Sequence, residues 1–449
     1  MNAPATGAGA AAEAMDESIP ESCDLAIIGG GPAGSCLATL AAERGWKVVL
    51  LEKDCHPRFH IGESLLPKNL EIFEQLGLDQ AVAQIGVYKA GAEFFLEDAN
   101  TPVERIRFDN ALDCRYPHAW QVRREDFDKL LFERARAAGA VCVQGAKVCA
   151  ADFPKGAPAN LAIERAGQKT ALRAGFVADA SGRQGFLARM MDLRRANREH
   201  ASAAVYGHFE GVQPRPDDRA GDISICWFEH GWMWMIPLRD GVMSVGAVCD
   251  PGYLKSRRGS PQEFLLETIA HNGHVAARME NARLVMPVTA TGNYSYQATR
   301  AGGERWLLIG DAHTFIDPVF SSGVLMAMSG ARAAVPIVEA ALRGQSTRSL
   351  MRRYERRLRR GARMFSWFIY RFNTPTMRHL FFHRRNVFRI EQAVISVLAG
   401  DVYDNPAVRR RLWLFRWVYF FTALAQGRRA WHARRKRLST GATRHEQSA

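Results

Sequence analysis

A glycine-rich segment near the start of the chain limits the fold more than any other feature of the sequence. It reads Gly29-Gly30-Gly31-Pro32-Ala33-Gly34, follows the apolar run 25–28 and precedes an alanine- and leucine-rich stretch, 35–44. This order predicts a strand, a tight glycine turn and a helix. A second predicted strand, 47–51, is followed directly by Glu52, whose carboxylate can bind ribose hydroxyls. Together the two strands and the helix predict a dinucleotide-binding βαβ unit.

Each glycine of this turn has its own expected role. Gly29 permits the turn, Gly31 lets the backbone approach a pyrophosphate, and Gly34 allows the helix to pack closely on the strand. The free N–H groups at the helix N-terminus would then contact the phosphates. We therefore predict that this region binds the cofactor through Gly29, Gly31, Ala33, Gly34, Glu52 and Lys53.

Two later strand-and-turn segments favour FAD as the dinucleotide. One is 176–182; the other, 306–312, ends in Gly310-Asp311-Ala312 and is followed by a predicted helix at 322–342. The second segment resembles the second fingerprint of glutathione-reductase-like flavoproteins, which implies that Asp311 holds the ribityl chain of FAD. Each turn alone could be an ordinary βα turn, but three of them in this order favour an FAD-binding fold.

Over residues 23–345 the chain resembles the para-hydroxybenzoate-hydroxylase-like flavoproteins. The resemblance implies an α/β glutathione-reductase-like FAD-binding fold with an interleaved antiparallel β-sheet substrate domain. It also implies that Arg123, within the segment 121–128, lies near the cofactor, although an ordinary helix start fits the same residues. The expected division is a disordered leader at 1–21, FAD-binding segments at 22–87, 123–200 and 299–345, sheet segments at 88–122 and 201–298, a basic helical region at 346–438 and a disordered tail at 439–449.

Three motifs within this frame resemble those of the flavin-dependent halogenases. Trp232-Met233-Trp234-Met235-Ile236-Pro237 matches the WxWxIP motif of that family, and strand alternation places Trp232 and Trp234 on one face. A pair of tryptophans packing a sheet would look the same. The resemblance implies that this pair blocks direct access of substrate to the flavin.

The other two motifs imply a catalytic lysine and a halide site. The segment 86–95 resembles the one that carries the essential lysine of halogenases, which would be Lys89. A lysine at the start of a strand, between aromatic and small residues, is more often simply exposed to solvent. The segment 317–324 implies that backbone N–H groups at Ser322 and Gly323 bind chloride, and a plain serine N-cap fits it too. Tryptophan halogenases have a glutamate where Phe320 stands, so we expect a phenolic or pyrrolic substrate instead.

The resemblance implies a complete reaction. A separate flavin reductase supplies FADH2, chloride or bromide is oxidised with oxygen, and the oxidised halogen reaches Lys89, which orients it or carries it as a haloamine. An electron-rich aromatic small molecule, free or tethered to an acyl or peptidyl carrier protein, is then halogenated in secondary-metabolite or pigment biosynthesis. No metal is expected, because the 8 cysteines have neither metal-ligand nor disulfide-framework spacing.

Positive charge is concentrated in the last quarter of the chain. From Arg343 onward there are 25 basic and 5 acidic residues, so the first 342 residues carry a net charge of −6. This region could bind the surface of an anionic membrane or an acidic carrier protein. Alternatively, it is a helical subdomain whose arginine face is exposed to solvent. No nucleic-acid recognition motif accompanies the charge. The apolar run 412–425 is too short to span a membrane and contains Arg416, and residues 1–20 lack a signal pattern, which predicts a cytoplasmic protein.

Three other functions remain open from the sequence. An aromatic hydroxylase would keep the flavin but needs substrate beside it, where the tryptophan pair is expected. A geranylgeranyl-reductase-like flavoprotein shares the segment 61–67, Ile-Gly-Glu-Ser-Leu-Leu-Pro, but not the lysine or the tryptophans. A noncatalytic, membrane-associated flavoprotein would account for the basic region alone.

Overall fold

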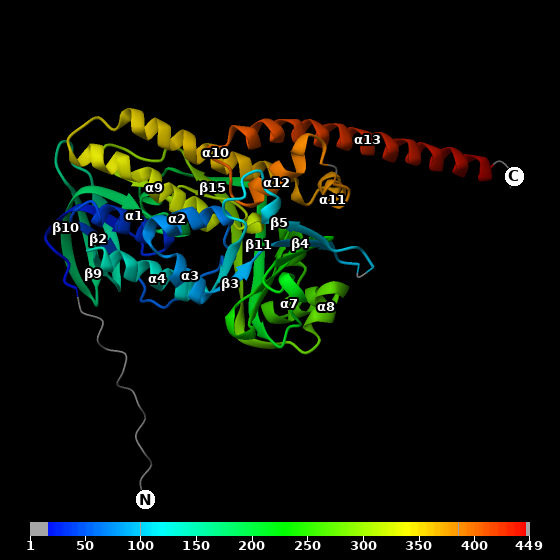
Figure 1. The fold of residues 1–449 in the computed structure, drawn as a ribbon, viewed down its shortest axis with the longest axis horizontal. Helices are drawn as coiled ribbons and strands as arrows, with labels where there is room; N and C mark the ends of the chain where they lie inside the picture. The colour runs from blue at the N-terminus through cyan, green and yellow to red at the C-terminus, as the bar shows by residue number, and fades with distance from the viewer. Residues whose placement is uncertain (1–16, 99, 385, 446–449) are drawn as a thin grey trace, which may run out of the picture.

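The structure, a computed structural model, describes residues 17–98, 100–384 and 386–445. Two large β-sheets lie side by side, and helices of the C-terminal third lie along one edge of both (Figure 1). The last helix extends beyond the rest of the molecule (Figure 1). This arrangement is the predicted α/β fold with an interleaved sheet and a mostly helical C-terminal region.

The first sheet contains the predicted nucleotide-binding strands. Four of its pairings are parallel: β2 with β7, β1 with β2, β1 with β10, and β10 with β16. The first half of β10 pairs with β9 and its last residues pair with β16, so this long strand joins the parallel part to an antiparallel extension. The strands are β1 (Ser22–Ile28), β2 (Val48–Leu51), β7 (Val141–Val143), β8 (Ala146–Asp152), β9 (Ala159–Arg165), β10 (Gln168–Asp179) and β16 (Trp306–Leu308).

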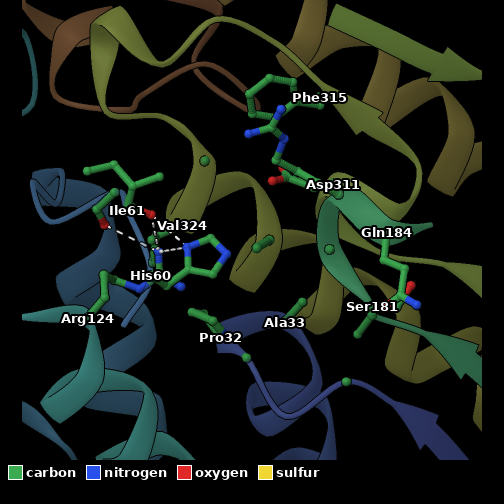
Figure 2. A pocket seen from close by; sticks show the side chains of 18 of the residues that line it. Pro32, Ala33, His60, Ile61, Arg124, Ser181, Gln184, Asp311, Phe315 and Val324 are labelled. Atoms are coloured by element: carbon green, nitrogen blue, oxygen red, sulfur yellow. Dashed lines mark hydrogen bonds between the residues drawn. The ribbon is translucent and has the colours of Figure 1, made fainter. Parts of the chain in front are cut away.

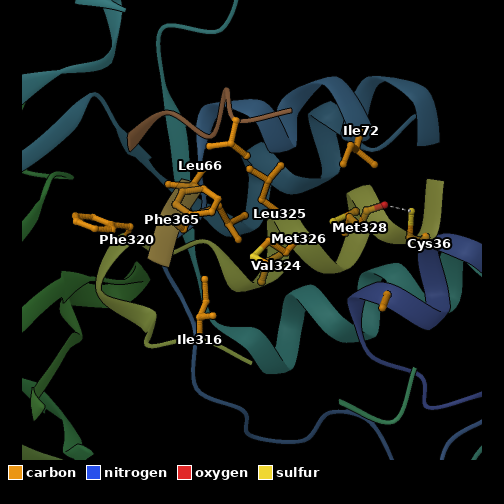
Figure 3. Packing of buried hydrophobic residues seen from close by; sticks show 14 of the residues in the cluster. Cys36, Leu66, Ile72, Ile316, Phe320, Val324, Leu325, Met326, Met328 and Phe365 are labelled. Atoms are coloured by element: carbon orange, nitrogen blue, oxygen red, sulfur yellow. Dashed lines mark hydrogen bonds between the residues drawn. The ribbon is translucent and has the colours of Figure 1, made fainter. Parts of the chain in front are cut away.

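Helices α1 and α9 pack together against this sheet. Cys36 of α1 lies beside Met328 of α9, with 3.9 Å between the cysteine sulfur and the methionine carbonyl oxygen (Figure 3). Among the described helices, α9 alone has the length and apolar composition of a membrane span, and most of it is buried in the core. The helices of this part are α1 (Pro32–Ala42), α2 (Leu70–Leu76), α3 (Asp79–Ile85), α4 (Arg124–Ala137), α5 (Phe186–Met190) and α9 (Gly323–Leu342).

The second sheet has eight strands in the order β17-β15-β11-β14-β13-β12-β4-β5. Alternation along β13 sends Trp232 and Trp234 into the core shared with the first sheet, and Met233 and Met235 into a separate core on the other face. That other face is covered by α6 (Pro251–Lys255), α7 (Pro261–Ala270) and α8 (Gly273–Met279). The strands are β4 (Gly91–Leu96), β5 (Glu104–Arg107), β11 (Arg194–Glu210), β12 (Ile223–Phe228), β13 (Gly231–Pro237), β14 (Met243–Cys249), β15 (Arg283–Ala298) and β17 (Thr314–Phe315).

A two-stranded ribbon and several single turns complete this part of the chain. The ribbon pairs β3 (Gly86–Lys89) with β6 (Ala119–Val122) in antiparallel fashion. The single 3₁₀ turns are η1 (Pro67–Asn69), η2 (Phe108–Asn110), η3 (Gly182–Gln184), η4 (Asp217–Arg219), η5 (Arg239–Gly241), η6 (Gly310–Ala312), η7 (Pro318–Phe320) and η8 (Val387–Arg389).

The C-terminal region is helical, as expected, but its helices are longer than the pattern indicated. Within the basic helical region expected at 346–438, the first helix runs to Phe372, because Phe365, Phe368 and Phe372 continue its buried stripe. The expected tail at 439–449 is helical as far as His445, since no proline interrupts the final helix, and 446–449 lie outside the described residues. The helices are α10 (Arg348–Phe372), α11 (Pro375–Phe382), α12 (Ile390–Leu398) and α13 (Pro406–His445).

Several other expected segment boundaries differ from the structure, among them the one between 87 and 88, which falls inside β3. The boundary at 200 falls inside β11, because this strand pairs with β15 on both sides of that position. Strand β17 lies in the segment 299–345 but belongs to the second sheet. Of the expected leader, 1–16 lie outside the described residues, whereas Glu17 accepts a hydrogen bond from the backbone N–H of Cys142.

Candidate functional site

A cavity of about 400 Å³ lies where the two sheets meet. One wall comes from the turn between β1 and α1 and from the end of β2, and another comes from Trp232 and Trp234 of the second sheet. The segments 58–64, 180–186 and the start of α9 close the remaining sides. Residues far apart in the sequence therefore surround one space.

The glycine turn has the geometry that its sequence predicts. Gly29 adopts a φ of 104°, and a Cβ there would lie 2.5 Å from the carbonyl oxygen of Ala180. A Cβ on Gly34 would lie 1.9 Å from the carbonyl oxygen of Gly29, so α1 can approach β1 only with glycine at this position. A Cβ on Gly31 would meet nothing closer than 3.7 Å. The backbone at Gly31 is therefore open toward the cavity.

The carboxylate of Glu52 stabilises this turn from the end of β2. Its Oε2 accepts a hydrogen bond of 2.7 Å from the backbone N–H of Gly30, and its Oε1 accepts one of 3.0 Å from that of Asp54. Glu52, Lys53 and Ala33 all line the cavity. The first turn of α1 has no side-chain cap, so its N–H groups remain available to an anion.

The structure places Arg124 at the cavity and not Arg123. Arg123 lies at the N-cap of α4, where its Nη2 donates to the carbonyl oxygen of Arg239 over 3.2 Å and is 3.5 Å from Asp240. Arg124 lines the cavity and is 6% exposed. Successive helical residues differ by about 100° in direction, so one position decides which arginine faces inward.

The Arg124 guanidinium organises the wall on its side of the cavity. It forms two hydrogen bonds to Asp128, of 2.8 and 3.0 Å, and donates to the carbonyl oxygen of Ile61 over 3.0 Å (Figure 2). Because Arg124 is so close and the ring is buried, the pKa of His60 falls to about 4. This histidine is therefore neutral at physiological pH. Arg58 adds a second cation, 3.3 Å from Glu52 and 3.5 Å from Asp128.

Asp311 lies on the opposite wall, beside Phe315 and away from Arg124 (Figure 2). Turn η6 positions it, and the Tyr296 hydroxyl donates a 2.7 Å hydrogen bond to its backbone carbonyl oxygen. Burial raises the pKa of the Asp311 carboxyl to about 6, and the charge of Arg183 partly opposes this shift. The carboxyl group is ready to accept a hydrogen bond from a ligand hydroxyl.

The two tryptophans form an aromatic wall of the cavity. Trp232 and Trp234 are each 5% exposed, and their ring centroids are 5.9 Å apart. The indole N–H of Trp234 donates to the Ser244 hydroxyl over 3.1 Å, which fixes the orientation of that ring. Further ring contacts hold this partition in place, because the Trp232 centroid lies 6.4 Å from that of Phe372 and the Trp234 centroid lies 5.9 Å from that of Tyr206.

Lys89 is buried beyond the lining of this cavity. It is 2% exposed, and its Nζ donates to the Ser64 hydroxyl over 2.8 Å and to the Leu65 carbonyl oxygen over 3.0 Å. Burial lowers the pKa of the Lys89 amine to about 7, and the charge of Asp222 partly opposes this shift. Ser64 itself lines the cavity, so the buried amine is hydrogen-bonded to a residue of the cavity wall.

The start of α9 supplies the last wall. Gly323 and Ser321 line the cavity, whereas Ser322 is 1% exposed and makes no side-chain cap. Of the two residues predicted to bind halide, only Gly323 therefore faces the cavity. Phe320, just before them, is buried, and its ring centroid lies 5.4 Å from that of Phe372. An apolar ring thus occupies position 320.

Sequence reasoning missed several residues of this site. Ser64 and Glu63 both line the cavity, and the sequence of their segment, 61–67, indicates only a family resemblance and no role for either residue. Glu63 is 1% exposed and its Oε1 lies 2.6 Å from the Nε2 of His208. For Arg58 and Arg124, no local pattern in the sequence distinguishes them from the other arginines of the chain.

The residues present fit FAD. The open first turn of α1, the unobstructed backbone at Gly31 and the arginines 58 and 124 suit a pyrophosphate, and Glu52 and Asp311 suit sugar and ribityl hydroxyls. In the part of the chain that the structure describes, no group of three His, Cys, Asp or Glu residues could hold a metal ion.

Comparison with known proteins agrees with this geometry. Residues 22–367 match the family described as FAD binding domain. A flavin-dependent halogenase of Armillaria mellea is 32% identical over 74% of this chain and 70% of its own length. The 1H-pyrrole-2-carbonyl-peptidyl-carrier-protein chlorinase of Pseudomonas fluorescens is 28% identical over 85% of this chain and 90% of its own length.

The chain spans about two thirds of the length of two further relatives. A tryptophan 2-halogenase of Chondromyces crocatus is 32% identical over 73% of this chain, and the matched part spans 63% of that halogenase. A flavin-dependent halogenase of Penicillium aethiopicum is matched over 66% of its length.

Solved structures share the fold over most of the chain. A flavoprotein/dehydrogenase from Cytophaga hutchinsonii superposes with a TM-score of 0.83 and 28% identity, covering 90% of this chain and 100% of that one. The flavin-dependent brominase Bmp2 superposes with a TM-score of 0.79 and 25% identity, covering 88% and 98%.

Proposed function

We propose, from the premise that this chain belongs to the flavin-dependent halogenase family of FAD-binding proteins, that it chlorinates or brominates an electron-rich aromatic ring. The ring is a phenol or a pyrrole, presented free or on a carrier protein. A separate flavin reductase supplies FADH2. We place the reaction in a cytoplasmic pathway of secondary-metabolite or pigment synthesis.

The buried amine of Lys89 is the observation that carries this proposal. Bound FAD in its reduced form would supply, with oxygen, the oxidising power that halide activation requires. With a pKa near 7, the amine is partly neutral at neutral pH and can hold an electrophilic halogen through its nitrogen lone pair. Its burial keeps water away from a reactive halogen species.

Ser64 gives the amine a fixed position relative to the cavity. Its hydroxyl accepts a hydrogen bond from Lys89, and Ser64 is itself a residue of the cavity lining. A halogen species formed in the cavity therefore meets Lys89 across one side chain. The same contact orients the lone pair of the amine when it is neutral.

The tryptophan partition supports halogenation over hydroxylation. Direct transfer of oxygen to an aromatic ring requires the ring to lie against the flavin. Trp232 and Trp234 fill the wall of the cavity on the side of the second sheet, so a substrate ring cannot stack there without moving both. A small oxidised halogen needs no such movement.

The apolar surroundings of Phe320 support a neutral phenol or pyrrole. Phe320 lies between the lining residues Val319 and Ser321 and packs edge-on against Phe368 and Phe372, with centroids 6.3 and 5.4 Å away, so position 320 supplies no carboxylate beside the cavity. The similarity to a chlorinase that acts on a pyrrole held by a carrier protein points the same way. An activated ring of this kind loses its proton readily once the halogen is attached.

The test is turnover with a flavin reductase, FAD, NADH and bromide on phenols and pyrroles, both free and carrier-bound. Mass spectrometry should show the bromine isotope pattern in the product. Lys89→Ala should abolish bromination while FAD binding persists, and Lys129→Ala, at an exposed lysine, should leave it unchanged. Hydroxylated products, or bromination that survives Lys89→Ala, would contradict the proposal.

A further inference from the structure

The final helix has apolar side chains on two opposite faces. The inner face, with Val408, Leu412 and Phe415, is buried against the other C-terminal helices, and the Phe415 ring stacks on Phe368 at 5.6 Å. The outer face presents five large apolar side chains that are 43–59% exposed, namely Trp413, Trp417, Phe420, Phe421 and Leu424. A helix that is apolar all round is usually buried on all sides, so the outer face calls for a partner.

The exposed side chains form one stripe with a cation at each end. Relative to Arg410, the apolar residues follow at positions 3, 7, 10, 11 and 14, and Arg428 follows at position 18, which are positions of a single helix face. The stripe therefore extends over roughly 27 Å along the helix. Both arginines are exposed. We call this set, from Arg410 to Arg428, the outer stripe of α13.

An apolar groove of about 740 Å³ lies directly beside the outer stripe and shares Trp417 and Phe421 with it. Its far rim is the η8 turn, where Val387 is 55% and Phe388 75% exposed. The Arg411 guanidinium donates to the Phe388 carbonyl oxygen over 3.1 Å, which ties this turn to α13. The exposed apolar surface is thus a stripe, a groove and a protruding phenylalanine on one side of the molecule.

The charge of the helix identifies the partner. Residues 406–445 contain eleven arginines and lysines and no aspartate or glutamate. Tryptophan and phenylalanine next to arginine are typical of helices that lie in the interface of an anionic bilayer. We propose that the outer stripe of α13 and the Phe388 turn dock on an anionic lipid surface, with the groove open to an acyl chain.

The observations favour a lipid surface over a protein partner. A second copy docked through the same face would bring two sets of arginines together, and like charges oppose that contact. Figure 1 shows α13 running past the rest of the molecule, so the helix can lie along a plane without obstruction by the sheets. This inference goes beyond the proposed halogenation and does not depend on it.

The experiment measures binding of the full-length protein to vesicles by sedimentation. Vesicles of phosphatidylcholine with added phosphatidylglycerol should bind the protein, and vesicles of phosphatidylcholine alone should bind it far less. Trp417→Glu, and independently Phe420→Glu, should weaken binding by about ten-fold or more. Leu266→Glu, at a side chain that is 43% exposed on α7, is the matched control and should have no effect.

A second set of variants tests the charges. Arg410→Gln combined with Arg428→Gln should weaken binding by about five-fold for each arginine. The control is Arg257→Gln combined with Arg258→Gln, at two exposed arginines between α6 and α7. Melting temperature and bound FAD are measured for every variant, so that loss of folding is recognised.

Three outcomes would overturn the inference: no binding to anionic vesicles, equal binding to neutral ones, or binding unaffected by both glutamate variants. A dimer in light scattering that Trp417→Glu dissociates would assign the surface to a second copy. Specific binding of an acidic carrier protein at the stripe, without vesicle binding, would assign it to that protein. Vesicle binding needs no turnover, so its failure and the failure of the proposed function are separate results.

Discussion

Replacing Lys89 with methionine should change how the stability of the protein depends on pH. Methionine has a similar length and no charge, so Lys89→Met removes the cost of burying an ammonium group. That cost follows from the lowered pKa. A shift from 10.5 to about 7 corresponds to about 5 kcal/mol, at about 1.4 kcal/mol per pKa unit.

The sign follows from proton binding in the two states. Between pH 7 and 10.5 the unfolded chain keeps a proton on Lys89 that the folded chain has lost, so the free energy of unfolding of the wild type rises with pH. Well below pH 7 the folded protein bears the full cost of burying the Lys89 ammonium group, and above about pH 10.5 this cost vanishes because the amine is neutral in both states. The methionine variant lacks this rise. Its stability relative to the wild type should therefore fall by about 2 kcal/mol between pH 7 and pH 9, because the folded amine is still half protonated at pH 7.

The assay is urea denaturation of both proteins at pH 7 and pH 9. Methionine leaves the Ser64 hydroxyl and the Leu65 carbonyl without their hydrogen-bond partner, but that loss is independent of pH and cancels in the comparison. Lys129→Met, at an exposed lysine, should show no such pH dependence. A stability difference between Lys89→Met and the wild type that stays constant from pH 7 to pH 9 would refute the reasoning.

Three further variants test the cavity. Arg124→Lys should weaken FAD binding by about ten-fold, or about 1.4 kcal/mol, in a fluorescence titration, whereas Arg123→Lys should have almost no effect; the reverse order would restore the role predicted for Arg123. Gly34→Ala should abolish FAD binding, since its Cβ would overlap a backbone oxygen 1.9 Å away, whereas Gly427→Ala, in open space, should stabilise its helix by about 1 kcal/mol in thermal denaturation. Ser64→Ala should lower the rate of halogenation by about ten-fold and shift its pH profile, with FAD binding intact; an unchanged profile would argue against its contact with the buried amine.

Local patterns in the sequence were enough for much of the fold. The glycine turn requires a positive φ at Gly29 and the absence of a Cβ at Gly34, and both requirements are visible in the residue types alone. Alternation along Trp232 to Pro237 predicted correctly that both tryptophans share one face of a strand. Such features depend on neighbours in the chain, so they can be inferred without a structure.

Contacts between distant segments could not be inferred in this way. Ser64 and Lys89 are 25 positions apart, and only the pairing of β3 with β6 and the packing of the 61–67 segment bring the hydroxyl to the amine. The choice between Arg123 and Arg124 depends on the rotation of α4 relative to the first sheet. That rotation is set by the packing of the buried side of α4, which includes Phe127 and Leu131, against other elements. The two neighbouring arginines do not by themselves show which of them lies on that side.

The sequence by itself therefore determined the class of fold, the dinucleotide turn and the aromatic face of the second sheet. The tertiary structure alone decided that Lys89 is buried, that Gly323 and not Ser322 faces the cavity, and that one side of α13 stays uncovered. The reason is that burial is a property of the assembled molecule. The pKa of an amine and the exposure of a tryptophan are both set by atoms that the chain brings from elsewhere.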